Sequence, residues 1–202
     1  MHNRWILLSA AIIIVSVFFS GCISTRPQSE IPAAPAPVQS GTQTMSVSSP
    51  GEFSIRVDSL TDGSVLPDVY TCKGASESPE IAWDGVPAGT KSLVLILDDP
   101  DAPGGRFTHW IVYNIPPVSG ELARAQPNIK VLANGAQQGD TSAGSRGYYP
   151  PCPPVGTTHR YMFRLYAVDM DITQPTADRD SIDWALTGHT IAETRFTTTF
   201  KR

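Results

Sequence analysis

The sequence has 202 residues, of which 41% are hydrophobic and 17% are charged, and its formal net charge is -4. This composition is globular, and the length suffices for one domain with a sizeable core plus additional segments. Lys and Arg total 15 against 19 Asp and Glu, so no basic excess exists to neutralise a phosphate backbone, which argues against nucleic-acid binding. Three cysteines without a C-x-x-C pair exclude a disulfide-framework miniprotein and a paired-cysteine zinc site.

Residues 1–21 have the pattern of a lipoprotein-type export signal. A short basic start precedes an apolar run from Trp5 to Phe19, which is on the short side for a membrane-spanning helix. Two small residues then precede Cys22, as in a lipoprotein processing site, where the thiol takes a diacylglyceryl group. The alternative is an uncleaved signal anchor with an inert Cys22. Both interpretations predict a protein attached to the cell membrane on its extracytoplasmic face.

Residues 22–51 are predicted to be a spacer that the lipid at Cys22 anchors. The segment is rich in Pro, Ala, Ser, Thr and Gln, so it cannot bury enough apolar area to offset the entropy of ordering it. The folded domain is therefore expected to span residues 52–202.

That domain is predicted to consist mainly of β-strands. Alternating apolar residues predict half-buried strands at Phe53–Val57 and Arg160–Asp169. Continuous apolar runs predict buried strands at Leu93–Leu97 and His109–Ile115, and Ile191–Phe200 is rich in Thr and Phe, which favour strands. Long strands joined by proline-rich loops indicate an antiparallel β architecture.

One or two helices are expected late in the chain. Ser181 is a candidate helix N-cap, and Ile182, Ala185 and Leu186 provide an apolar face. Gly188 is placed to end this helix.

Residues able to bind a ligand gather in two rigid loops, each of which leads into a strand. Asp98–Trp110 contains two prolines and two glycines, and Gly147–Tyr161 contains four closely spaced prolines. Such loops hold polar groups still. His159 and Tyr161 are two residues apart on a predicted strand and therefore project from the same face. The candidate ligand-binding residues are Asp99, Asp101, His109, Tyr148, Pro153, His159 and Tyr161.

These motifs resemble the phosphatidylethanolamine-binding protein family, in its bacterial and archaeal Raf-kinase-inhibitor-like branch. The resemblance extends from about Phe53 to Arg202. It rests on the ordered motifs Asp99-Pro100-Asp101-Ala102-Pro103, His109-Trp110, Cys152-Pro153-Pro154-Val155-Gly156 and His159-Arg160-Tyr161, with Ser78-Pro79, Ile81, Trp83 and Gly188-His189 in support. It implies a β-sandwich of one large and one small antiparallel sheet. It also implies a small anion-binding pocket at one end.

In such a pocket, the imidazole N–H groups and the Tyr148 hydroxyl are donors suited to a phosphate or carboxylate. Asp99 near a histidine is expected to fix its tautomer and to favour the cation. Asp101 is expected to brace its own loop. Arg160, on the opposite strand face from His159, is expected to form an ion pair rather than to contact a ligand.

Two further expectations concern cysteine and tryptophan. Cys72 and Cys152 are a candidate disulfide, because export favours oxidation and both remain once Cys22 is lipidated. Their spacing alone does not establish that their Cα atoms lie close together. Trp83, Trp110 and Trp184 are expected in the core.

The predicted function is a non-enzymatic, membrane-anchored binding protein with a pocket for a small phosphate-type anion, without cofactor or metal, that regulates a partner protein. One alternative, which the resemblance also implies, is an inhibitor of a carboxypeptidase-type serine hydrolase. A second alternative is a metal-dependent enzyme, since Asp and His are metal ligands, although no H-E-x-x-H spacing is present. A serine hydrolase is disfavoured because no G-x-S-x-G elbow occurs.

Overall fold

The computed structural model describes residues 51–173 and 177–202. The predicted signal peptide 1–21, Cys22 and residues 22–50 of the predicted linker lie outside the described residues. Within the described ranges, no helix is long and apolar enough to cross a membrane.

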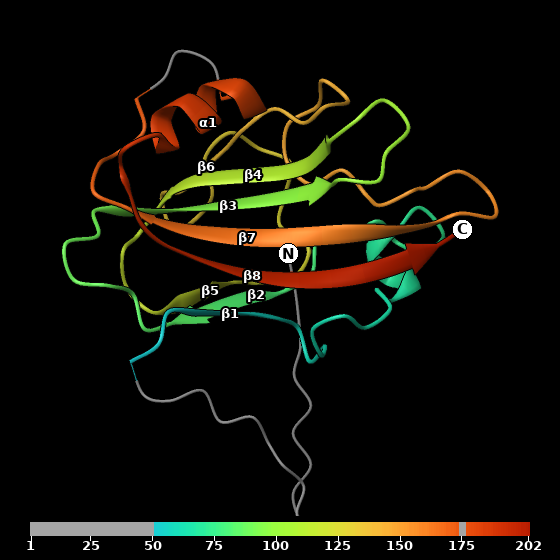
Figure 1. Ribbon diagram of the computed structural model, residues 1–202, viewed down its shortest axis with the longest axis horizontal. Helices are drawn as coiled ribbons and strands as arrows, with labels where there is room; N and C mark the ends of the chain where they lie inside the picture. The colour runs from blue at the N-terminus through green and yellow to red at the C-terminus, as the bar shows by residue number, and fades with distance from the viewer. Residues whose placement is uncertain (1–50, 174–176) are drawn as a thin grey trace, which may run out of the picture. The chain divides into compact units, whose positions relative to one another are not determined.

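Two antiparallel sheets form the framework (Figure 1). The small sheet has the order β1 (Ser54–Val57), β2 (Ile81–Asp84) and β5 (Gly120–Leu122). The large sheet has the order β6 (Gln137–Gln138), β4 (Phe107–Ile115), β3 (Ser92–Asp99), β7 (Thr158–Val168) and β8 (Thr190–Lys201). A short 3-10 helix, η1 (Asp68–Tyr70), and one α-helix, α1 (Arg179–Leu186), complete the described elements. The predicted mainly β fold, with a large sheet, a small sheet and a late helix, is confirmed.

The continuous apolar run in β3 is explained by burial on both faces of the large sheet. Leu93, Leu95 and Leu97 pack into the core shared with the small sheet. Val94 and Ile96 point the other way, into a second core beneath α1. Since successive strand residues face opposite sides, a strand covered on both sides has no position for a solvated residue.

The helix begins three residues earlier than the sequence pattern suggested. Asp178 is the N-cap, and its side chain accepts a hydrogen bond from the Ser181 backbone N–H. The proposed cap at Ser181 is therefore wrong, because Ser181 supplies the N–H that the cap satisfies. The helix ends as expected, with Thr187 as C-cap and Gly188 at a positive φ of 79°.

One expected core residue lies on the surface. Trp83 and Trp110 are 3% and 0% exposed, whereas Trp184 is 71% exposed. The buried stripe of α1 consists of Arg179, Ile182, Ala185 and Leu186, and Trp184 falls outside that stripe. The prediction that Trp184 is a core aromatic is wrong.

Candidate functional site

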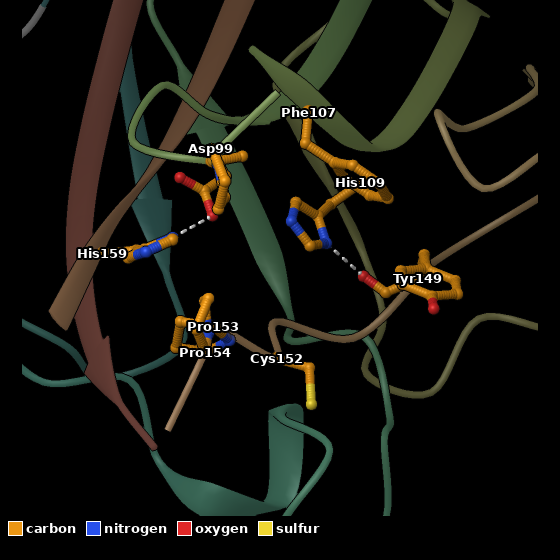
Figure 2. A pocket seen from close by; sticks show the side chains of 10 residues that line it. Asp99, Phe107, His109, Tyr149, Cys152, Pro153, Pro154 and His159 are labelled. Carbon is orange, nitrogen blue, oxygen red and sulfur yellow. Dashed lines mark hydrogen bonds and ion pairs between the residues drawn. The ribbon is translucent and has the colours of Figure 1, made fainter. Parts of the chain in front are cut away.

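A cavity of about 390 Å³ opens at the end of the large sheet where β3, β4 and β7 meet the two proline-rich loops. Figure 2 shows His109 and His159 on opposite sides of the space next to Asp99, with Pro153 and Pro154 closing it. The lining residues are Asp99, Ala102, Pro103, Phe107, His109, Tyr149, Cys152, Pro153, Pro154 and His159. The two motifs predicted to meet therefore share one cavity, and four predicted residues line it: Asp99, His109, Pro153 and His159.

A β-bulge in β4 turns His109 toward this cavity. Leu97 pairs with Trp110, but the next residue of β3, Asp98, pairs with Thr108, so His109 is an extra residue in β4. The extra residue shifts the alternation of side chains by one position. Thr108 consequently lies on the helix side, where its hydroxyl donates to the Asp98 carboxylate at 2.7 Å. His109 can then face the same cavity as Asp99.

Asp99 and His159 form a buried pair across β3 and β7. The His159 Nδ1 and an Asp99 carboxylate oxygen are 2.7 Å apart, and their side chains are 7% and 5% exposed. The second carboxylate oxygen of Asp99 accepts the Asp101 backbone N–H at 2.8 Å. Because a carboxylate only accepts, the proton of this pair resides on His159 Nδ1, which leaves Nε2 for a ligand.

His109 is held by a reciprocal contact with Tyr149. Its Nδ1 donates to the Tyr149 carbonyl at 2.8 Å, and the Tyr149 N–H donates to the His109 carbonyl at 2.8 Å. Figure 2 shows the other ring nitrogen turned toward Asp99 and His159. Burial holds the pKa of His109 below its usual value, although the Tyr149 carbonyl and the Asp99 carboxylate act in the opposite direction. His109 is therefore neutral at pH 7, and its Nε2 is a hydrogen-bond acceptor.

Asp101 lies outside the cavity lining. Its carboxylate accepts from the Arg160 guanidinium at 2.7 and 2.9 Å and from the Arg160 backbone N–H at 2.9 Å. These hydrogen bonds from Arg160 lower the pKa of Asp101 to about 2. Asp101 thus fastens the first loop to β7, and Arg160 forms the surface ion pair that strand alternation predicted.

The two candidate tyrosines do not line the cavity either. Tyr148 is buried, and its hydroxyl donates to the Tyr70 carbonyl at 2.6 Å, so that donor is already occupied. Tyr161 packs edge-on against the His109 ring, with centroids 5.4 Å apart. Its buried hydroxyl makes no hydrogen bond of ordinary geometry, and burial together with the nearby Asp99 carboxylate raises its pKa.

A disulfide joins the second loop to the segment after η1. Cys72 and Cys152 are bonded, with Cα atoms 5.4 Å apart, so the candidate pairing is present in the structure. The Cys72 N–H also donates to the Pro151 carbonyl at 3.1 Å. Because Cys152 lines the cavity and precedes Pro153, this bond holds one cavity wall in place.

Sequence reasoning missed the aromatic part of the wall as a binding surface. Phe107 and Tyr149 flank His109, with ring centroids 4.7 and 6.0 Å from its own. Phe107 could have been found from its spacing, since residues two apart on a strand share a face. Tyr149 has no such periodic signal, and only the family resemblance of its loop placed it at the rim of the pocket.

The buried, neutral His109 should make stability depend on pH. Since its folded pKa lies below the unfolded value of about 6.5, the unfolded chain binds more protons once the pH drops below about 6.5. The free energy of unfolding should therefore fall from pH 7 to pH 5. Urea unfolding at several pH values should show a smaller decline for His109→Asn than for the wild type. An equal decline in both proteins would contradict the assignment.

Among the described residues, no three His, Cys, Asp or Glu side chains are grouped in a way that could hold a metal ion. The structure presents a two-sheet antiparallel β-sandwich with a histidine-lined cavity at one end, and this architecture defines the fold class of the protein.

Comparison with known proteins identifies the family to which this fold belongs. The family model for phosphatidylethanolamine-binding protein matches residues 56–201. The UPF0098 protein of Methanothermobacter thermautotrophicus is 42% identical over 152 residues, which cover 74% of this chain and 99% of that protein. The chain belongs to the phosphatidylethanolamine-binding protein family.

Two further relatives support the fold and bear on localisation. The crystal structure of the homologue CT736 from Chlamydia trachomatis matches with a TM-score of 0.68 and 35% identity, covering 75% of this chain and 99% of that one. LppC of Mycobacterium tuberculosis strain H37Rv, whose name describes it as a candidate lipoprotein, is 42% identical over 117 residues, or 57% of this chain and 55% of that protein.

Proposed function

We propose that this protein is a membrane-anchored, extracytoplasmic binding protein that holds a phosphate-type anion between His109 and His159 and does not catalyse a reaction. The observation that carries the proposal is the shared cavity of the two rings, each with its Nδ1 engaged by a protein oxygen. This arrangement fixes both imidazoles and leaves both Nε2 atoms for one guest.

The neutral state of His109 limits which anions the site can bind. In a neutral imidazole whose Nδ1–H is engaged, Nε2 is a hydrogen-bond acceptor. At pH 7 the ligand must therefore donate a hydrogen bond to Nε2 of His109 or transfer its proton to that atom. Hydrogen phosphate keeps a proton at pH 7, and a phosphomonoester, whose second pKa is about 6, gains one as the pH falls toward that value. Sulfate does not. The site should therefore prefer phosphate to sulfate, and it should bind phosphate more tightly as the pH falls.

The remaining cavity wall supports binding over catalysis. Most of the lining consists of apolar or proline side chains, and Cys152 has no free thiol because it is in the disulfide. Within the described lining there is no Ser, Thr or Lys that the His159–Asp99 pair could activate as a nucleophile.

Calorimetry of the full chain with inorganic phosphate tests the site. His109→Ala and His159→Ala should each weaken binding about tenfold or more, since a charge-assisted hydrogen bond contributes ~1.5–3 kcal/mol. His189→Ala is the matched control, because His189 is an exposed histidine that pairs with Asp169. Unchanged affinity in both cavity variants, or sulfate binding as tight as phosphate at pH 7, would contradict the proposal.

The lipid anchor is tested separately. Cells grown with a radioactive fatty acid should label the wild-type chain but not Cys22→Ala, because the acyl chains are carried through this thiol. Equal labelling of the two proteins would reject the anchor and leave the cavity assignment untouched.

A further inference from the structure

Trp184 is an exposed aromatic side chain on the helix that covers the large sheet. It is 71% exposed, whereas the other described tryptophans are almost fully buried. Other exposed apolar residues, such as Val118 and Val155, lie singly in loops, as is normal for a protein surface. A tryptophan presented on a helix differs, because a large rigid ring is the side chain most enriched at the centres of interfaces.

A hollow lies beside the Trp184 ring. It has a volume of about 250 Å³ and is lined by Met170, Trp184, Ala185, Thr187 and His189. The Trp184 ring therefore borders a concave surface that could receive a partner's side chain.

The chain segments next to this hollow are rich in carboxylates, although no carboxylate lines the hollow itself. Between residues 169 and 189 the sequence contains five aspartates and one arginine. That arginine, Arg179, is buried and paired with Asp98 and Asp183. The exposed Arg106, which precedes β4, also pairs with Asp183. Asp180 lies one helical turn before Trp184, at the i,i+4 spacing that places two side chains on one face. Asp169 lies next to the hollow, because its carboxylate is 2.8 Å from Nδ1 of His189, and His189 lines the hollow.

An indole ring flanked by carboxylates favours a cationic partner. A guanidinium or ammonium group over a tryptophan face is attracted by the ring quadrupole, and nearby carboxylates add Coulomb attraction. The same carboxylates repel the anionic headgroups that an exposed tryptophan would meet at a membrane. We propose that the α1 face formed by Trp184, Asp180, Asp169 and the adjacent hollow binds a basic segment of a partner protein, with an Arg or Lys side chain lying against the Trp184 indole.

Calorimetric titration of the full chain with a deca-arginine peptide tests this surface. Trp184→Ala should weaken binding about fivefold to tenfold, the range that a loss of a partly desolvated cation–π contact produces. Trp184→Tyr should keep part of the affinity, and Asp180→Asn should lower it about threefold. Glu121→Gln is the control, since it removes the same charge from an exposed residue of β5 in the small sheet.

Three outcomes would overturn the proposal. Deca-glutamate could bind as tightly as deca-arginine, or Glu121→Gln could weaken deca-arginine binding as much as Asp180→Asn while Trp184→Ala has no effect. In the third outcome, the full chain would bind phosphatidylcholine vesicles through Trp184 but not bind the peptide, which would assign this face to a lipid surface.

Discussion

Replacing Cys72 and Cys152 together with Ala is expected to lower the free energy of unfolding by about 4 kcal/mol. The bond joins residues 80 positions apart, and the chain entropy that such a loop loses in the unfolded state corresponds to ~4 kcal/mol. Urea denaturation of the oxidised wild type and of the variant measures the difference. Because Cys152 lines the cavity, the variant should also bind phosphate more weakly.

The single variants provide the matched controls. Cys72→Ala and Cys152→Ala should each lose nearly as much stability as the double variant, because either change removes the same bond. Wild-type protein treated with dithiothreitol should behave like them. A loss below about 1 kcal/mol in either single variant would show that the bond contributes little to stability.

Replacing Arg179 with Met is expected to cost about 3–5 kcal/mol, because it leaves the buried Asp98 carboxylate without a compensating charge. The guanidinium Nε and Nη2 lie 3.3 and 3.2 Å from one Asp98 oxygen, and the side chains are 10% and 3% exposed. The pair attaches α1 to the end of β3. Urea denaturation monitored by circular dichroism measures the loss.

A double variant separates the cost of an unpaired charge from the value of the pair. Asp98→Leu combined with Arg179→Met removes both charges, so it should be markedly more stable than Arg179→Met alone. A double variant as unstable as the single one would show that the ion pair, rather than the unpaired carboxylate, accounts for the loss.

The long strands β3, β4, β7 and β8 of the large sheet could be predicted because their signal is local. The run from Leu93 to Leu97 and the alternation of Tyr161, Phe163 and Leu165 reflect burial of one or both faces of each strand. The short strands β2, β5 and β6 were missed. β5 and β6 have only three and two residues, and in β2 the small apolar Ala82 stands between Ile81 and Trp83, so apolar and polar residues do not alternate clearly.

The candidate site was also predicted in part, because some of its features are local in the sequence. The proline-rich loops and their histidines are visible in the sequence, and His109 and His159 do line one cavity. The roles of Tyr148 and Asp101 depend on partners distant in the chain. Tyr148 donates to the Tyr70 carbonyl, which no local pattern indicates. Strand alternation predicted that Arg160 would form an ion pair, but it did not identify Asp101 as the partner.

The sequence by itself determined the fold class, the positions of the long strands and the two rigid segments that carry the imidazoles, because periodicity and proline content act on the chain locally. Only the tertiary structure decided which side chains face the cavity. The β-bulge turns His109 toward Asp99, and the packing of α1 leaves Trp184 in solvent. Strand register and helix orientation are set by the elements packed against each segment, so the direction of a side chain becomes defined only when those elements are in place.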